Sequence, residues 1–364
     1  MYMSFRWLGQ EDTIPLEYIR QIPRLRSIVA ALYDLPPGAV WPQDRLQSLR
    51  AQAEAADLAW RVVESIPVPE SIKLGGADRD RDIDAWMASM RNVAAVLGPA
   101  SLVQNSADWS GRESPVVITY NFMPVFDWTR SQLARRLPDG STCLAYDQEA
   151  VDRLDPLTSD LDLPGWLATY TRPQLTRLVA QYRELGSEAV YDNMVYFLKA
   201  ISPLAEELGL QLALHPDDPP WPVFGIPRVI DGAPALRRLF TDVPSPANKL
   251  CLCSGSFGVN PDNNIVSMID EFPERLAFMH LRNVKITGPH SFEECGHCSS
   301  SGDLDMAAIV EALVRNKFDG PVRPDHGRMI WGETGKPGYG LYDRALGAAY
   351  LNGLIEQAER SFGT

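Results

Sequence analysis

Four short segments of the sequence share one pattern, an apolar run that ends on a side chain able to bind a metal ion. The residues that close these runs are two histidines, a cysteine and an aspartate: His215, Cys253, His280 and Asp325. A brief apolar run is typical of a buried strand, and a parallel barrel places its catalytic groups where such strands end. We therefore predict that the four side chains converge on one ion and that the protein is a metal-dependent enzyme.

Each of these residues also has an ordinary structural explanation. A histidine that closes a strand can be a satisfied core residue, and a buried free cysteine usually packs as a small hydrophobe, as we expect for Cys251. Cys253 differs because small, flexible residues follow it at once. The stiff Pro-Asp-Asp-Pro-Pro segment after His215 fixes the chain where the strand ends. Its Asp217 and Asp218 are ligands, orienting groups for His215, or solvated turn residues.

The densest polar cluster of the chain is Arg-Pro-Asp-His-Gly-Arg at 323–328. Adjacent residues do not easily bind the same ion, so we assign Asp325 to the metal and leave His326 for acid–base chemistry near neutral pH. A plain charged turn is the alternative. A phenol can also serve as an acid or base, and Tyr339 and Tyr342, which flank one Gly-Leu pair, are the candidates.

Other polar residues are candidates for binding substrate. Arg282 and Asn283 supply donors suited to a carboxylate and to hydroxyls, although an arginine just past a strand can simply lie on the surface. Arg328 could neutralise substrate charge, and Asn121 closes a further predicted strand. The Cys-Gly-His-Cys run at 295–298 is too cramped to place four ligands on one ion, so we expect only His297 to reach the site, as a loop residue.

The composition indicates a globular protein with no attraction to polyanions. Of 364 residues, 45% are hydrophobic and 22% are charged, and the net charge is −13. We therefore expect no nucleic-acid or membrane partner, and an anionic substrate would need a local basic patch. The first residues lack the apolar core of a signal peptide, and no apolar run approaches the ~18–20 residues of a membrane span. Five cysteines fit reduced thiols in a cytoplasm.

Strand-like runs alternate with helical patterns, which is typical of βα units and a parallel sheet. Eight strands are predicted, at Met3–Trp7, Ile28–Tyr33, Leu58–Ser65, Val116–Asn121, Leu210–His215, Lys249–Cys253, Ala277–Leu281 and Val322–Asp325. Helices are predicted at Pro42–Ala56, Arg81–Leu97, Gln174–Glu207, Ala233–Thr241, Asp262–Phe272, Leu304–Asn316 and Tyr342–Glu359. This count predicts an α/β fold, a (β/α)8 TIM barrel, with residues 1–364 as a single catalytic domain.

Three stretches interrupt the alternation, and we expect irregular insertions near residues 97–114, 122–172 and 287–303. The second is long for a βα connection, and long loops in compact domains are usually lids or insertions. Its Trp128 and Trp166, with Arg130, would cover the active-site mouth. The second and third stretches follow predicted strand ends, so long loops should crowd the C-terminal face of the barrel.

Several long motifs carry a resemblance to a known family. They are Phe5-Arg-Trp, Tyr120-Asn-Phe-Met-Pro-Val-Phe-Asp-Trp-Thr-Arg130, His215-Pro-Asp-Asp-Pro-Pro, Cys253-Ser-Gly-Ser, His280-Leu-Arg-Asn and Arg323-Pro-Asp-His-Gly. Through them, nearly the full chain resembles the mannonate dehydratases, a family of xylose-isomerase-like barrels.

The resemblance implies a (β/α)8 lyase that converts D-mannonate to 2-dehydro-3-deoxy-D-gluconate in hexuronate breakdown. The family's metal ligands carry over to the four strand-end residues above, and its acid–base residues to His326 and Tyr339, with Tyr342 as the alternate. The expected cofactor is Mn2+, with Fe2+ second and Zn2+ third, since a thiolate and two imidazoles suit all three metals. We expect a cytoplasmic homo-oligomer, a dimer.

Three features depart from the family pattern. Residues 97–114 are longer and more polar than expected, Asn264 stands where an acid is expected, and Tyr33 replaces a histidine found in some relatives. None of these removes a proposed ligand. The alternatives are a metal-dependent sugar isomerase or epimerase on the same barrel, usually richer in carboxylate ligands, and a non-catalytic sugar-acid-binding protein. Intact His326 and Tyr339 argue against the second.

Overall fold

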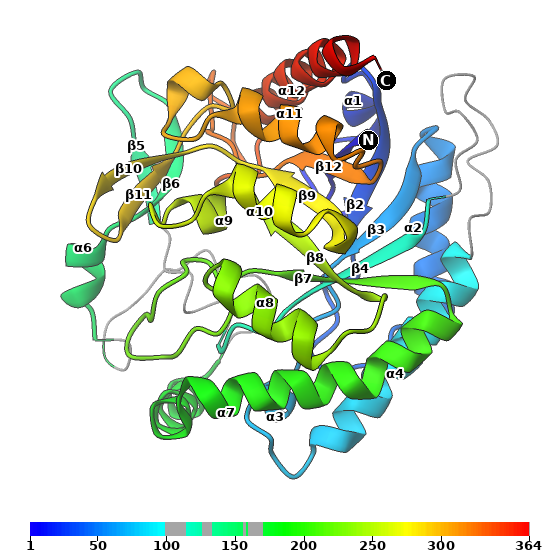
Figure 1. Cartoon of the computed structure of the whole chain (residues 1–364), viewed down its shortest axis with the longest axis vertical. Helices are drawn as coiled ribbons and strands as arrows, with labels where there is room; N and C mark the ends of the chain where they lie inside the picture. Colours follow the sequence, from blue (N-terminus) through cyan, green and yellow to red (C-terminus); the bar gives the residue numbers. More distant parts are fainter. Residues whose placement is uncertain (99–113, 126–132, 156–157, 159–169, 364) are drawn as a thin grey trace.

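The computed structural model describes residues 1–98, 114–125, 133–155, 158 and 170–363. Eight parallel strands close into a barrel in the order β1-β12-β9-β8-β7-β4-β3-β2 (Figure 1). The strands are β1 Tyr2–Arg6, β2 Leu25–Ala30, β3 Ala59–Glu64, β4 Val116–Asn121, β7 Leu210–His215, β8 Asn248–Cys253, β9 Leu276–Leu281 and β12 Pro321–Pro324. All eight predicted strands are present, and the predicted barrel is confirmed. β2 begins and ends three residues before the predicted strand. The prediction extended too far because buried Ala31 and Leu32 continue the apolar pattern beyond the paired residues.

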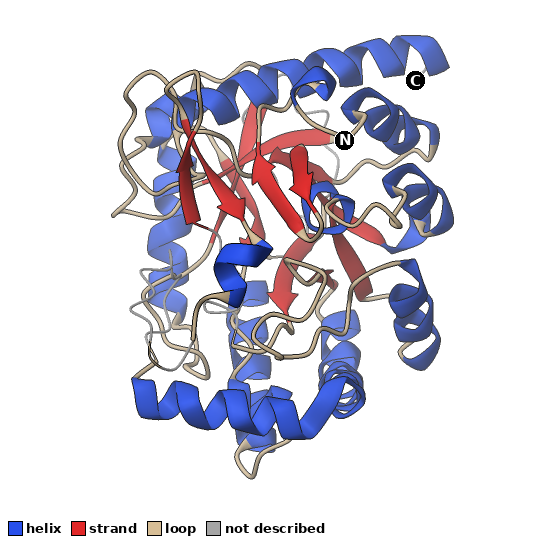
Figure 2. Cartoon of the chain, turned by 90° about the vertical axis from the view of Figure 1, so that its left-hand side faces the viewer, coloured by secondary structure: helices blue, strands red, loops and turns tan. Residues whose placement is uncertain are grey.

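Helices surround the strands on the outside of the barrel (Figure 2). The main ones are α2 Gln43–Ala55, α4 Arg79–Leu97, α7 Arg172–Glu207, α8 Ala233–Asp242, α10 Ile265–Glu271, α11 Met306–Arg315 and α12 Leu341–Phe362. Each matches a predicted helix to within a few residues, although α7 is interrupted at Gly186, where φ is 75°. Shorter helices were missed because four or five residues show no helical period: α1 Leu16–Arg20, α3 Glu70–Lys73, α6 Gln148–Asp152 and α9 Ser254–Gly258.

A four-stranded antiparallel sheet, in the order β10-β11-β6-β5, lies beside the barrel. Its strands are β5 Leu133–Arg136, β6 Thr142–Tyr146, β10 Val284–Gly288 and β11 Ser291–Glu294. The prediction that 122–172 and 287–303 are irregular is therefore wrong for β5, β6 and β11. β5 (Leu-Ala-Arg-Arg) and β11 (Ser-Phe-Glu-Glu) are mostly polar and lack the apolar run by which the barrel strands were predicted. β6 (Thr-Cys-Leu-Ala-Tyr) does contain such a run, and the prediction missed it.

This sheet belongs to the C-terminal face of the barrel. β10 follows β9 after two residues, and an isolated bridge joins Thr142 to Met329, which lies beyond the end of β12. The described part of the long 122–172 connection thus stands at the face where a lid was expected. The three residues proposed for that lid, and nearly all of 97–114, lie outside the described residues.

Side chains fill the barrel interior. One buried cluster contains Val29, Val62, Val117, Ala213, Cys251, Ala277 and Phe278. Cys251 packs there as predicted, and burial raises the pKa of its thiol. Since residues two apart in a strand face the same side, Cys253 lies above Cys251, at the end of β8. The single-domain organisation of the chain remains our proposal.

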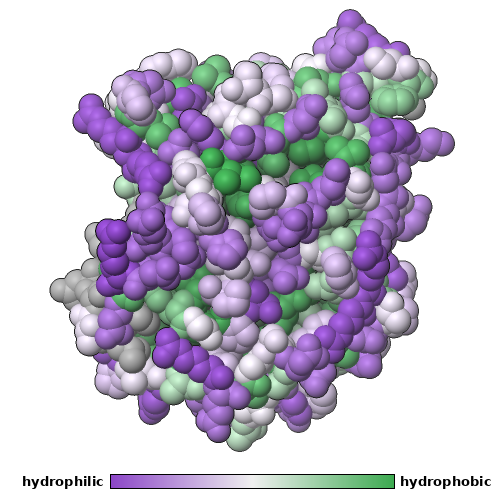
Figure 3. Space-filling view, turned by 60° about the vertical axis from the view of Figure 1, so that its left-hand side comes forward, coloured by the Kyte–Doolittle hydropathy of each residue, from purple (hydrophilic) through white to green (hydrophobic). Residues whose placement is uncertain are grey.

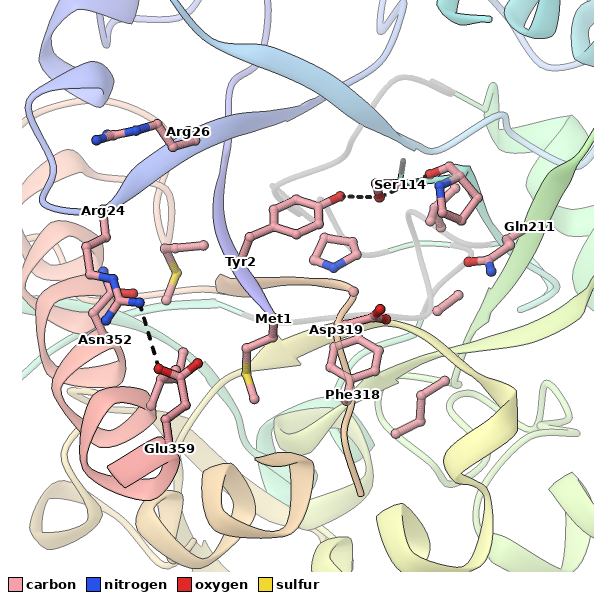
Figure 4. Close-up of a pocket in the computed structure, with 18 residues that line it drawn as sticks. Met1, Tyr2, Arg24, Arg26, Ser114, Gln211, Phe318, Asp319, Asn352 and Glu359 are labelled. Carbon is pink, nitrogen blue, oxygen red and sulfur yellow. Dashed lines mark hydrogen bonds and ion pairs between the residues drawn. The ribbon is translucent and has the colours of Figure 1, made fainter. Parts of the chain in front are cut away.

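A cavity of about 550 Å³ lies at the N-terminal end of the barrel (Figure 4). Many of the residues around it lie at or near the starts of strands, among them Met1, Tyr2, Gln211 and Asp319, and Glu359 comes from helix α12. Hydrophilic side chains predominate on the face shown in Figure 3, and hydrophobic ones gather in the recesses between them. Among the described residues, no helix has the length and apolar character needed to span a membrane.

Candidate active site

A cavity of about 620 Å³ opens at the C-terminal ends of the barrel strands. Its polar lining comes mostly from residues that end a strand or follow one closely: Arg6, Glu64, Asn121, His215, Asp218, His280, Arg323, Asp325, His326 and Tyr339. Barrel enzymes build their active sites at this face from the ends of several strands. The cavity is therefore the candidate active site.

Three of the four predicted metal ligands bring their donor atoms together. One ligand atom each from His215, Cys253 and His280 lies within 4.8 Å of the others. These residues close β7, β8 and β9, which are neighbours in the barrel. Asp325 follows β12, on the other side of β9, and its Oδ2 lies 3.6 Å from Cys253 Sγ and 3.7 Å from His280 Nδ1. The structure thus gathers the four predicted residues around one point.

The chemistry of these donors fits a divalent ion. Neither ring nitrogen of buried His280 makes a hydrogen bond of good geometry, which is unusual for buried polar atoms. His215 donates from Nδ1 to the carbonyl of the next residue at 2.8 Å, so its Nε2 keeps a free lone pair. Burial lowers the pKa of His215 and favours the neutral, metal-binding form. Burial also raises the pKa of Asp325, but Arg323 and other positively charged neighbours together outweigh it and hold that pKa well below its usual value.

Glu64 joins this centre, although the sequence analysis did not select it. Its carboxylate lies 2.8 Å from Arg6 Nη1 and 2.8 Å from Arg323 Nη2, and its Oε2 lies 3.4 Å from His280 Nε2. Burial raises the pKa of Glu64, but the two guanidiniums hold it well below its usual value. The charged carboxylate therefore lies on the Nε2 side of the His280 ring, while Nδ1 faces Asp325. The missed signal was the same pattern as before, an apolar run that ends on a carboxylate.

His326 and Tyr339, the predicted acid–base pair, are hydrogen-bonded to each other. Tyr339 Oη lies 2.5 Å from His326 Nε2, and His326 Nδ1 faces the carboxylate of Glu294. Both members of the pair are buried and line the cavity. Tyr342, the alternate, is 44% exposed and packs against Trp331. The structure therefore favours Tyr339 over Tyr342.

The two aspartates of the loop after β7, Asp217 and Asp218, are both buried and paired with protein groups. Asp217 accepts hydrogen bonds from the backbone of Val229 at 2.7 Å and of Ile230 at 2.9 Å. Asp218 forms a buried ion pair with Arg282, at 3.1 Å. Neither aspartate is a solvated turn residue, because both are buried. Asp217 orders the loop, and Asp218 balances a buried charge.

Two of the five predicted substrate-binding residues lie at the centre. Asn121 lines the cavity, accepts a hydrogen bond from Met123 N at 2.6 Å and lies beside His215 in the β4–β7 register. Arg282 is fully buried, and its Nη1 lies 3.6 Å from Asp325 Oδ2. Arg282 therefore neutralises carboxylates of the site and is not among the described residues that line the cavity.

The other three are not among the described residues that line the cavity, so substrate contact by them stays a prediction. Asn283 donates to the carbonyl of Cys298 at 2.7 Å and so holds its loop. Arg328 pairs with Asp343 at 2.9 Å. His297 is buried so closely against Gly347 that a Cβ there would collide with its ring, and burial lowers its pKa to about 4. Each of these residues follows a strand or lies in a loop, but its side chain contacts other protein groups and does not line the cavity.

Comparisons with known proteins agree with this geometry. A model of the D-mannonate dehydratase (UxuA) family matches residues 1–363. The chain is 46% identical over 359 residues to a mannonate dehydratase from Oceanobacillus iheyensis, a match that covers 99% of this chain and 98% of the relative. It also resembles the crystal structure of mannonate dehydratase from Streptococcus suis serotype 2, with 42% identity, a TM-score of 0.88, and coverage of 100% of this chain and 96% of that chain.

More distant structures share the fold alone. A xylose isomerase domain protein from Planctomyces limnophilus is 12% identical, with a TM-score of 0.53 and coverage of 98% of both chains. The expected likeness of the fold to xylose-isomerase-like barrels is thereby confirmed. The full-length family match and the 46% identical relative carry the closer assignment. The chain belongs to the mannonate dehydratase family.

Proposed function

We propose that this chain catalyses the metal-dependent dehydration of D-mannonate to 2-dehydro-3-deoxy-D-gluconate and water. The observation that carries the proposal is a single cavity lined by His215, His280 and a hydrogen-bonded histidine–tyrosine pair, with the ligand atom of buried Cys253 within 4.8 Å of those of both imidazoles. Membership of the family supports the reaction and a sugar-acid substrate.

His215, Cys253, His280 and Asp325 would hold the metal ion. When bound, a divalent ion supplies Lewis-acid stabilisation of the negative charge that develops on the substrate. We propose Mn2+ as the resident ion, with Fe2+ second and Zn2+ third. Elemental analysis of the purified protein, followed by reconstitution with each ion, tests that order.

The reaction has two difficulties, since the C2 proton of an aldonate is weakly acidic and hydroxide leaves poorly from C3. A base and an acid are therefore both needed. His326 and Tyr339 are proposed for these roles, without assigning which takes the proton. The C2 proton passes to the pair, and the C3 hydroxyl takes a proton from the pair and leaves as water, so that the enol of the product forms. A proton transfer between Nε2 and Oη restores the pair, and the enol gains a proton at C3 as its C2 hydroxyl loses one, which gives the 2-keto-3-deoxy acid.

The cavity can also hold the negative charge of the substrate. Arg6, Lys73 and Arg323 line it, although each is paired with a buried or half-buried carboxylate. In a protein with a net charge of −13, these cations offset the acidic field locally. We propose that Asn121 contacts substrate hydroxyls and that Arg282 contributes through its buried charge.

One assay tests the function against its alternatives. The metal-loaded protein is incubated with D-mannonate, and the expected product is a 2-keto-3-deoxy acid. Turnover of a neutral aldose or ketose in place of mannonate would indicate a sugar isomerase or epimerase, and unchanged mannonate would indicate a binding protein. The family match does not favour either alternative.

We also expect a homodimer that works in the cytoplasm without a nucleic-acid or membrane partner. The support is the net charge of −13, which repels polyanions, and five cysteines that fit a reducing compartment. Light scattering on the eluting protein should give twice the mass of the chain. A monomer mass would contradict the dimer.

A further inference from the structure

Glu294 lies behind the proposed acid–base pair and comes from outside the barrel. It is the last residue of β11, in the four-stranded sheet, and it is fully buried. Its Oε1 contacts Nδ1 of His326, on the side of the ring opposite the bond to Tyr339. The sheet thus delivers a carboxylate to the rear of a barrel residue.

The contact dictates where the histidine carries its proton. A carboxylate can only accept hydrogen bonds, so Nδ1 of His326 must donate to it. Nε2 is then the nitrogen that gains and loses a proton, and it lies 2.5 Å from Tyr339 Oη. The orienting partner of a histidine sets which ring nitrogen is available for chemistry.

The surroundings favour an ionised Glu294. Nη1 of Arg282 lies 3.8 Å from Oε1 and 3.1 Å from Asp218 Oδ2. The guanidinium therefore lies among three buried carboxylates, since Asp325 Oδ2 is also 3.6 Å from Nη1, and it offsets part of their negative charge. Moving one charged partner out of such a buried cluster would leave uncompensated charge. The cluster around Arg282 therefore holds the Glu294 carboxylate in place.

We propose that Glu294 is a positioning residue for the dehydration: it fixes the His326 ring and the proton on Nδ1, so that Nε2 exchanges protons with Tyr339 and substrate. This inference rests on the proposed function. A proton taken from C2 and a proton given to the departing C3 hydroxyl balance within the pair, and Glu294 itself neither gains nor loses one. The four-stranded sheet is then part of the catalytic apparatus.

The neighbouring Glu293 provides a matched control. It lies on the same strand, so its side chain points to the other side, where it pairs with Arg135 at 3.4 Å. In metal-loaded enzyme, Glu294→Gln should lower kcat about 10–100-fold, the range for orienting partners of active-site histidines. KM and metal content should stay near wild type, and Glu293→Gln should match wild type throughout. Equal kcat in both variants would overturn the proposal, as would loss of metal from Glu294→Gln.

A second measurement needs no Glu294 variant to fold. Nitrogen-15 spectra of the histidine-labelled, zinc-loaded protein report which ring nitrogen carries a proton, and His326→Asn identifies the His326 signals. We expect the proton on Nδ1 of His326 in the wild type. A wild-type proton on Nε2 with bare Nδ1 would refute the inference.

The two levels of proposal fail in different ways. If the wild type leaves mannonate unchanged, or if His326→Asn keeps full turnover, the proposed function or its acid–base pair fails. If both of those tests succeed and Glu294→Gln turns over like Glu293→Gln, the role of Glu294 alone fails.

Discussion

The two ends of the barrel hold cavities of similar size but opposite character. The C-terminal cavity, of about 620 Å³, gathers buried imidazoles and carboxylates, whereas the N-terminal cavity, of about 550 Å³, has no such cluster among its described residues. In the first, the side chains of Arg323 and Glu64 are 1% and 7% exposed. In the second, Arg24 and Glu359 are 53% and 33% exposed and 4.0 Å apart (Figure 4).

This difference shows that cavity size does not identify the active site, whereas buried charge does. Removing charges from water costs several kcal/mol for each ion, and pairing repays that cost only when the geometry is good. The gathering of buried arginines, carboxylates and histidines at one end of the barrel is therefore typical of a site that is retained for chemistry. At the other end, most of the described polar residues around the cavity are half-buried or exposed.

The largest contrast between the ends should appear in turnover. His326→Asn keeps the shape of the side chain but removes its proton exchange, so turnover should fall on the order of 10²–10⁴-fold, the usual range for a general acid or base. Metal content should remain unchanged. Gln211→Ala, at the N-terminal start of the strand that ends in His215, should leave turnover intact. Steady-state kinetics and elemental analysis check both variants, and loss of metal from His326→Asn would make it a ligand.

The buried ion pairs of Glu64 at the C-terminal end should contribute more to the free energy of unfolding than the exposed pair at the N-terminal end. Glu64→Gln leaves Arg6 and Arg323 charged and buried, which should cost about 3–5 kcal/mol at neutral pH. The folded-state pKa of Glu64 is lowered despite burial. Its stabilisation is therefore present above the unfolded carboxyl pKa of about 4.3 and is lost as the pH falls through the folded-state value. Urea unfolding of metal-free protein should show the variant approaching wild type in acid.

The matched change at the opposite end is Glu359→Gln. Its exposed pair with Arg24 should contribute within about 1 kcal/mol. The same unfolding experiment measures it at neutral pH. A large loss of stability there, or none in Glu64→Gln, would remove the contrast between the two ends.

Two cysteines of strand β8 allow a metal ligand at the strand end to be compared with a packing residue inside the barrel. Cys253→Ser removes a thiolate ligand and should weaken metal affinity by about 100-fold, at the upper end of the range for changes around metal sites. Cys251→Ala alters a packing residue two positions earlier and should keep the metal. Titration with a metal indicator measures both affinities. If Cys253→Ser retains full affinity and activity, Cys253 is not a ligand.

The barrel and its metal-capable residues were accessible from the sequence because both follow short-range patterns. An apolar run that ends on His215 or Cys253 carries its strand and its chemistry in the same few residues. Glu64 obeys the same pattern and was overlooked, since a carboxylate after an apolar run is common. Asp325 and His326 were separable because adjacent residues rarely serve one ion.

Other parts of the site depend on long-range pairing that one sequence does not reveal. Glu294 reaches His326 only because β11 pairs with β6, from a segment almost 150 residues earlier in the chain. Arg328 and Asn283 follow strand ends, as the ligands do, yet the side chain of Arg328 bonds to Asp343 of helix α12 and that of Asn283 to the backbone of a loop. Position at a strand end predicts the correct face of the barrel, but the direction of each side chain depends on contacts made elsewhere.

The smallest effects should distinguish the ends by kind and not by size. Tyr2→Phe removes a hydrogen bond of 3.0 Å to Ser114 at the N-terminal cavity, and Tyr33→Phe removes one of 3.1 Å from Arg6 at the active site. Each should cost about 0.5–1.5 kcal/mol of stability, the net worth of one hydrogen bond.

Tyr33→Phe should also change KM or kcat, because Arg6 holds Glu64 and Tyr33 lines the catalytic cavity. Tyr2→Phe should leave both constants unchanged, since its cavity contains no reacting group. Thermal unfolding and steady-state kinetics on the two variants check this pair, and a kinetic defect in Tyr2→Phe would show that the N-terminal cavity is coupled to catalysis after all.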